Sequence, residues 1–160
     1  YHCDMETMAQ AIGELRAEGY LPIATFQHEE VYTWSPVAAI ERDFKIVADA
    51  GAIIASGSQS HVPHYAEFYS DSFFHYGLGN LFFDQFGIAE NTDIGFLDRH
   101  VFYDGKYLGV ELIPIQFIDK VQPRLMTAEE KAETLAIMFD TVRMWWKDEN
   151  NQPLMPAWKQ

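Results

Sequence analysis

Two short apolar runs joined by one amphipathic helix constrain the fold of this chain most. Residues 20–27 and 52–55 are both predicted to be buried strands. Residues 36–50, between them, are predicted to form a helix, and the apolar residues on one of its faces are Ala39, Ile40, Phe44 and Val47. A strand–helix–strand unit implies two parallel strands joined by a right-handed crossover. Part of the sheet is therefore expected to be parallel.

Capping residues set the expected ends of the helices. Ser35 and Pro36 suit the cap and the first turn of the helix over 36–50. A helix is also predicted over residues 5–18. Thr127 and Glu130 have the spacing of a capping box, which predicts the start of a third helix.

The remaining strands are predicted to form antiparallel hairpins. Residues 66–69 and 72–76 surround a tight turn, and residues 94–103 and 107–117 flank Asp104-Gly105, the strongest hairpin signal in the sequence. A parallel unit followed by hairpins and a last helix predicts an α+β fold.

Charge and cysteine content exclude several classes of protein. Eleven Lys and Arg stand against 24 Asp and Glu, a net charge of −13, which argues against nucleic-acid binding through a basic face. The single cysteine, Cys3, excludes an intrachain disulfide. No apolar run is long enough to span a membrane. Because the chain starts without Met, it is expected to be a processed product or a piece of a longer protein.

Polar side chains follow the two strands of the parallel unit. His28, Glu29 and Glu30 come after the first strand, and Gln59 and His61 come after the second. The carboxyl ends of parallel strands meet at one edge of a sheet, so these side chains are expected to lie close together. Imidazole and carboxylate ligands suit zinc, manganese or iron. The alternative is that each histidine only forms hydrogen bonds within its loop.

The segment over residues 73–86 is unusual because two glycines interrupt a strand pattern. Asn80 follows them and either anchors its loop through side-chain hydrogen bonds or faces the site, and Asp84 is a further candidate to face the site. The aromatic residues here are expected in the core. His64 is expected in a supporting position at the site or on the surface.

Three motifs together resemble a known family. They are His28, Glu30 and Pro36; Asp49-Ala50-Gly51-Ala52 with the later Gly57-Ser58-Gln59-Ser60-His61; and Tyr76-Gly77-Leu78-Gly79-Asn80-Leu81-Phe82-Phe83-Asp84. In order and spacing they resemble the C-terminal half of capsule-synthesis proteins of the CapA type, which are associated with poly-γ-glutamate. That family is similar in fold to calcineurin-like metallophosphoesterases.

The resemblance implies a two-metal type of site. His28 and His61 would be metal ligands, and Gln59 stands where many metallophosphoesterases carry a histidine, so one of the two positions would be weak or empty. Glu30 would hold His28 or act as a base. The N-terminal half, which would supply the other ligands and the general acid, is expected from another part of the polypeptide or from another chain.

The resemblance also implies the fold and the function. The expected fold is an α/β sandwich, part of a four-layer metallophosphoesterase-like β-sandwich with flanking helices, over residues 1–147, followed by a tail over 148–160. The expected activity is metal-dependent hydrolysis, with Mn, Zn or Fe, of a phosphoester or a γ-glutamyl polymer in an exported, envelope-associated protein. The alternative is a non-catalytic structural or polymer-binding subunit that binds an anionic polymer.

Overall fold

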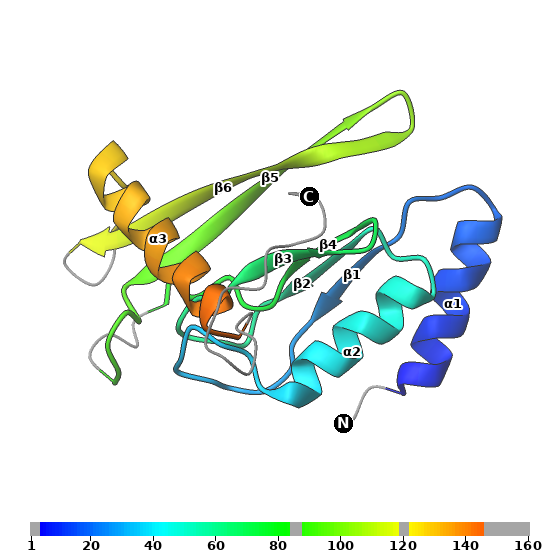
Figure 1. Ribbon diagram of the computed structural model, residues 1–160, viewed down its shortest axis with the longest axis horizontal. Coiled ribbons are helices and arrows are strands. Elements are labelled where there is room, and N and C mark those ends of the chain that lie inside the picture. The colour runs from blue at the N-terminus through cyan, green and yellow to red at the C-terminus, as the bar shows by residue number, and fades with distance from the viewer. Residues whose placement is uncertain (1–3, 84–87, 119–121, 146–160) are drawn as a thin grey trace.

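A computed structural model of the chain describes residues 4–83, 88–118 and 122–145, and its fold is α+β (Figure 1). The helices are α1 (Met5–Ala17), α2 (Ala38–Asp49) and α3 (Ala128–Trp145). The strands are β1 (Ile23–Phe26), β2 (Ile54–Gly57), β3 (Ala66–Tyr69), β4 (Ser72–His75), β5 (Ile94–Tyr103), β6 (Lys106–Ile118) and β7 (Gln122–Leu125). The predicted tail over 148–160, together with His2, Cys3 and Asp84, lies outside the described residues.

The first sheet has four strands in the order β1-β2-β4-β3. β1 and β2 are parallel and are connected through α2, which confirms the predicted strand–helix–strand unit. β4 adds to β2 in parallel, and β3 pairs with β4 as the predicted antiparallel hairpin. The parallel arrangement brings the carboxyl ends of β1, β2 and β4 to one edge of the sheet.

The second sheet is antiparallel, in the order β5-β6-β7. The turn between β5 and β6 is Asp104-Gly105, and both residues have positive φ (48° and 68°), as a tight hairpin of this kind requires. The short strand β7 was not predicted, because Pro123 interrupts its pattern; at the end of the sheet a proline is tolerated. The capping box at α3 is confirmed by two reciprocal hydrogen bonds between Thr127 and Glu130.

The predicted starts of β1, β2 and α2 are wrong. β1 begins at Ile23, three residues later than expected. β2 begins two residues later than expected, because the amides of Ala52 and Ile53 donate to carbonyls of α2 and of Pro22 before the strand starts. Ser35 does not cap α2. Val37 has extended backbone there, so the helix begins at Ala38 without a side-chain cap.

The core lies between α2 and the first sheet. Phe44 of α2 is fully buried, and its ring stacks on Phe26 of β1 with centroids 4.7 Å apart and meets Phe74 edge-on. Truncating a buried phenylalanine of this kind costs about 3–5 kcal/mol of stability. Figure 1 shows α1 and α2 on one side of the first sheet and the β5–β6 hairpin on the other.

The opposite face of the first sheet contacts β5. The rings of Phe73 and His100 lie 5.6 Å apart, and His75 of β4 forms a 2.7 Å hydrogen bond with Asp98 of β5. Alternate residues of β4 therefore face the helices and the second sheet, as the pleat of a strand requires. α3 packs against β6. No helix among the described residues is both long enough and apolar enough to cross a membrane.

Candidate functional site

The loops that follow β1 and β2 lie side by side, as predicted from the parallel pairing. The side-chain amide of Gln27 donates to Oε1 of Gln59 at 2.7 Å, and the backbone amide of Ser58 donates to the carbonyl of Phe26 at 2.9 Å. The hydroxyl of Ser60 also reaches the carbonyl of Val31 in the first loop. The side chains that follow the two strands are therefore held at one edge of the sheet.

His61 is held by Asn80. The Nδ1 atom of His61 lies 2.8 Å from Oδ1 of Asn80, and Nδ2 of Asn80 donates to the carbonyl of Thr92 at 2.8 Å. The bond to Thr92 fixes the orientation of the amide, so Oδ1 is the acceptor and Nδ1 of His61 carries the proton. In the neutral ring the lone pair is then on Nε2.

The Nε2 side of His61 faces Glu30. Oε1 of Glu30 lies 3.5 Å from Nε2 of His61, and the carboxylate also accepts a hydrogen bond from the hydroxyl of Tyr32. That hydrogen bond raises the pKa of Tyr32 above its ordinary value. The His61 ring lies between two aromatic rings, with centroids 5.5 Å from Tyr32 and 5.0 Å from Phe83. His61 is thus fixed in position, with a carboxylate beside its second nitrogen.

His28 has a different partner. Its Nε2 atom lies 2.8 Å from Oδ2 of Asp43, and Arg42 donates to the other oxygen of that carboxylate. Burial alone would raise the pKa of Asp43, but the hydrogen bonds from His28 and Arg42 and the charge of Arg42 hold the pKa below its ordinary value. The expectation that Glu30 holds His28 is therefore wrong. Asp43, one turn along the buried face of α2 from Ile40, holds it instead.

The described residues fit a divalent metal only in part. Within them, no group of three or more His, Cys, Asp and Glu side chains converges as a metal site would require. His61 and Glu30 have the chemistry of a ligand pair, and the bond to Asn80 orients the imidazole as outer partners of metal-bound histidines do. His28 would have to coordinate through Nδ1 or release Asp43. Gln59 is directed to Gln27.

His64 is a buried supporting residue. Its side chain is fully buried, and Nε2 lies 2.8 Å from the hydroxyl of Ser60, in the same loop as His61. Burial, together with the nearby His75, lowers the pKa of His64 to about 4, so the ring is neutral at neutral pH. Of the two placements expected for His64, its burial excludes the surface.

Sequence reasoning missed three residues that hold the site. Tyr32 and Phe83 stack on His61. Tyr32 has no signal in the sequence. The expectation that the aromatic residues of 73–86 lie in the core is wrong for Phe82 and Phe83, which are 74% and 42% exposed. Asp43 could have been predicted from the sequence, because it is an acidic residue on the apolar face of the helix that Ile40 and Phe44 define. A buried charge on an apolar stripe needs a partner, and a histidine after the neighbouring strand was available.

Comparison with known proteins bears on the first half of the chain. Residues 2–85 match the family model described as "Bacterial capsule synthesis protein PGA_cap". The matched range contains β1 to β4, the two loops with His28 and His61, and Asn80. Among curated proteins, no match was found.

Proposed function

The chain belongs to the bacterial capsule synthesis protein family, and on this premise we propose that it forms part of a metal-dependent hydrolase site. The proposed substrate is a phosphoester or a γ-glutamyl polymer that is handled during capsule synthesis. The proposed location is the cell envelope, outside the cytoplasm, where a capsule is assembled.

One observation carries the proposal: Asn80 fixes His61 so that Nε2 faces the carboxylate of Glu30 at 3.5 Å. A histidine that only stabilised its own loop would not need a hydrogen bond to a distant residue to fix which of its two nitrogens carries the proton. Oriented imidazole beside carboxylate is the arrangement that Mn, Zn and Fe sites use. His61 and Glu30 would hold one metal position, and His28 would contribute to another.

Each side chain has a role in this proposal. A bound divalent metal would supply Lewis acidity at the phosphoryl or acyl centre and lower the pKa of a water molecule. Glu30, with its side chain 46% exposed, would accept a proton from that water through the carboxylate oxygen that does not hold the metal. Tyr32 and Phe83 keep the His61 ring in place, and Asn80 keeps its proton on Nδ1.

The site needs further ligands from another segment or another chain. In the described part of the chain β1 pairs only with β2, so its outer edge is available for a further strand. Ile23 on this strand is 53% exposed. We therefore place the missing part of the site next to β1, where an added strand would end beside His28.

A non-catalytic, polymer-binding role is the alternative. Gln59 favours it, because an amide that is already hydrogen-bonded to Gln27 is a weaker ligand than the histidine of related metallophosphoesterases. In this reading a cation at His61 would bind an anionic polymer without turnover.

The test is hydrolysis by the natural polypeptide that carries this chain. It would be incubated with Mn²⁺ and either bis-p-nitrophenyl phosphate or poly-γ-glutamate, beside the variants Glu30→Gln, His61→Ala and, as a matched control, Glu18→Gln on the exposed end of α1. We expect turnover that falls by at least about 100-fold in the two site variants and is unchanged in the control. Metal binding without turnover on either substrate would favour the polymer-binding role.

A further inference from the structure

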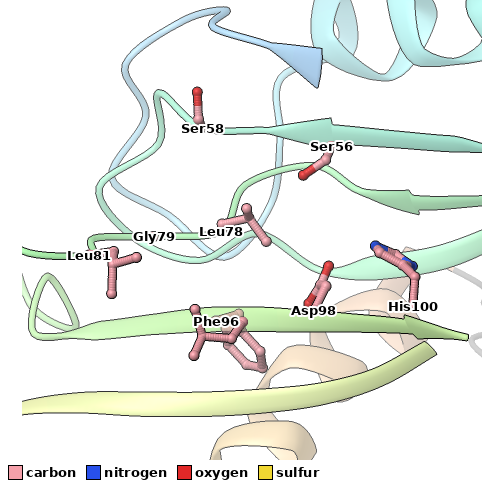
Figure 2. Close-up of a pocket in the computed structure, with 9 residues that line it drawn as sticks. Ser56, Ser58, Leu78, Gly79, Leu81, Phe96, Asp98 and His100 are labelled. Atoms are coloured by element: carbon pink, nitrogen blue, oxygen red, sulfur yellow. The ribbon is translucent and has the colours of Figure 1, made fainter. Parts of the chain in front are cut away.

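A pocket of about 490 Å³ lies between the end of β2 and the face of β5, beside the segment over residues 78–81. Figure 2 shows Ser56 and Leu78 on one side of it and Phe96, Asp98 and His100 of β5 on the other. None of the metal-ligand candidates His28, Gln59 and His61 lines this pocket. Asp98 and His100 also lie beyond the residues that match the capsule synthesis family.

In the part of the chain that the structure describes, three buried side-chain atoms have no hydrogen-bond partner, and one of them belongs to Asp98, which lines this pocket. They are Oδ1 of Asp98, Nε2 of His75 and Nδ1 of His64. The side chains of Asp98 and His75 are 6% and 0% exposed and are joined by the 2.7 Å bond between Oδ2 and Nδ1. Unpaired buried polar atoms are rare and costly, so the unpaired oxygen of Asp98 beside a pocket indicates that a hydrogen-bond donor binds there.

The bonds that are present show which of these atoms accept protons. The Asp98 carboxylate accepts from Nδ1–H of His75, which leaves Nε2 of a neutral His75 as an acceptor. The free oxygen of Asp98 therefore accepts hydrogen bonds, and a ligand in the pocket would have to donate one.

The charge of the pocket lining indicates which kind of ligand it would bind. The pocket lining contains one carboxylate, Asp98, and no Lys or Arg, and the chain as a whole carries a net charge of −13. A buried carboxylate with one unpaired oxygen is best compensated by a cation. Leu78 and Phe96 form an apolar wall beside it, which suits an aliphatic stem.

We propose that this pocket binds a primary ammonium group on an aliphatic stem. The ammonium donates to Oδ1 of Asp98, with the hydroxyl of Ser56 as a further acceptor, and the stem packs on Leu78 and Phe96. A free amino acid, a polyamine and the amino end of a peptide chain all share this chemistry. The inference does not depend on metal binding or hydrolysis at His61.

The probe is n-butylamine, which is protonated at pH 7, compared with the isosteric n-butanol and with butyrate. Binding to the 160-residue chain would be measured by NMR chemical-shift titration. We expect saturable shifts with butylamine at residues of β2 and β5, affinity at least about tenfold weaker for butanol, and no binding of butyrate. Equal affinity for butylamine and butanol would overturn the proposal, because a hydroxyl would then suffice.

Two variants test the assigned carboxylate. Asp98→Asn keeps the shape of the side chain and should weaken butylamine at least about tenfold while leaving butanol unchanged. Asp104→Asn makes the same chemical change at the exposed turn between β5 and β6 and should alter neither. Unchanged butylamine affinity in folded Asp98→Asn would refute the assignment. If that variant does not fold, the comparison of the three ligands on the native chain decides alone. Binding of a diamine and of lysine would then separate the possible sources of the ammonium group.

Discussion

The backbone oxygen of Asn80 lies against Gly95 of β5 so closely that a Cβ atom on that glycine would be 2.1 Å from it. The neighbouring residue Gly79 forms an isolated bridge with Gly95. β5 therefore sets the position of the segment that carries Asn80, and through Asn80 the position of His61. The candidate metal ligand thus depends on the second sheet, which lies outside the range matched to the family.

Gly95→Ala should displace Asn80 and disturb His61. Real Cβ atoms do not approach a backbone oxygen at this distance, so the strand or the loop must move, and we expect a loss of about 1–3 kcal/mol in the free energy of unfolding. Urea denaturation would measure it. The control is Gly13→Ala in α1, where the nearest atom to a Cβ is 3.8 Å away, and this change should stabilise by roughly 0.5–1 kcal/mol. Equal stability of the two variants would contradict the close approach.

Asn80→Ala should lower both stability and metal affinity. It leaves the carbonyl of Thr92 and Nδ1 of His61 without their partner at a site where Asn80 is only 5% exposed, at a cost of about 1–3 kcal/mol. Removing such an outer partner should also weaken metal binding by about 10–100-fold. Gln10→Ala, which removes an amide from the exposed face of α1, should change stability by no more than about 0.5 kcal/mol. Calorimetric titration with Mn²⁺ would report the affinity, and an unchanged value would contradict the positioning role.

His64 should make the fold sensitive to mild acid. Its pKa falls from 6.5 in the unfolded chain to about 4 in the folded state, so its contribution is complete above pH 6.5 and is lost as the pH falls towards 4. The loss amounts to roughly 3 kcal/mol over this window. His64→Gln should flatten the pH dependence of the free energy of unfolding between pH 6.5 and 4. A slope identical to that of the native chain would show that another group is responsible.

Asp43 should make the stability of the fold depend on pH in a lower range than His64 does. Because its folded pKa is held below the ordinary value of 3.8, its contribution is present above that pH and is lost as the pH falls further. Asp43→Asn should lower the free energy of unfolding by about 1–3 kcal/mol at pH 7, since His28 and Arg42 lose a charged partner. The difference in the free energy of unfolding between this variant and the native chain should shrink as the pH falls towards 2. A constant difference over the whole range would contradict the ion pair.

The sequence predicts the elements of this fold well, because most of them depend on local patterns. The parallel β1–β2 pair follows from the apolar runs around α2, and the Asp104-Gly105 turn follows from its backbone requirement alone. β7 and the start of α2 were not predictable in this way. β7 depends on its tertiary pairing with β6. The start of α2 is set locally by the Val37 carbonyl, which accepts from the amides of Ile40 and Glu41, and the Ser35-Pro36 signal places that start too early.

The candidate site was predictable only in part. The strand ends place His28, Gln59 and His61 at one edge of the sheet, but spacing does not say which carboxylate meets which histidine. Glu30 meets His61, whereas Asp43, fifteen residues from His28, holds that histidine. The pair of His75 and Asp98 joins two sheets, and no pattern in one strand marks a contact with another sheet.

Metal analysis tests the central claim, that His61 is a ligand of a divalent metal, most directly. The natural polypeptide that carries this chain would be purified beside His61→Ala, His28→Ala and the control Gln10→Ala, and its content of Mn, Zn and Fe would be measured. We predict stoichiometric metal in the native protein and in the control, and loss of metal in both histidine variants. A native protein that is folded and metal-free after incubation with these ions, or a His61→Ala variant with undiminished metal, would contradict the account.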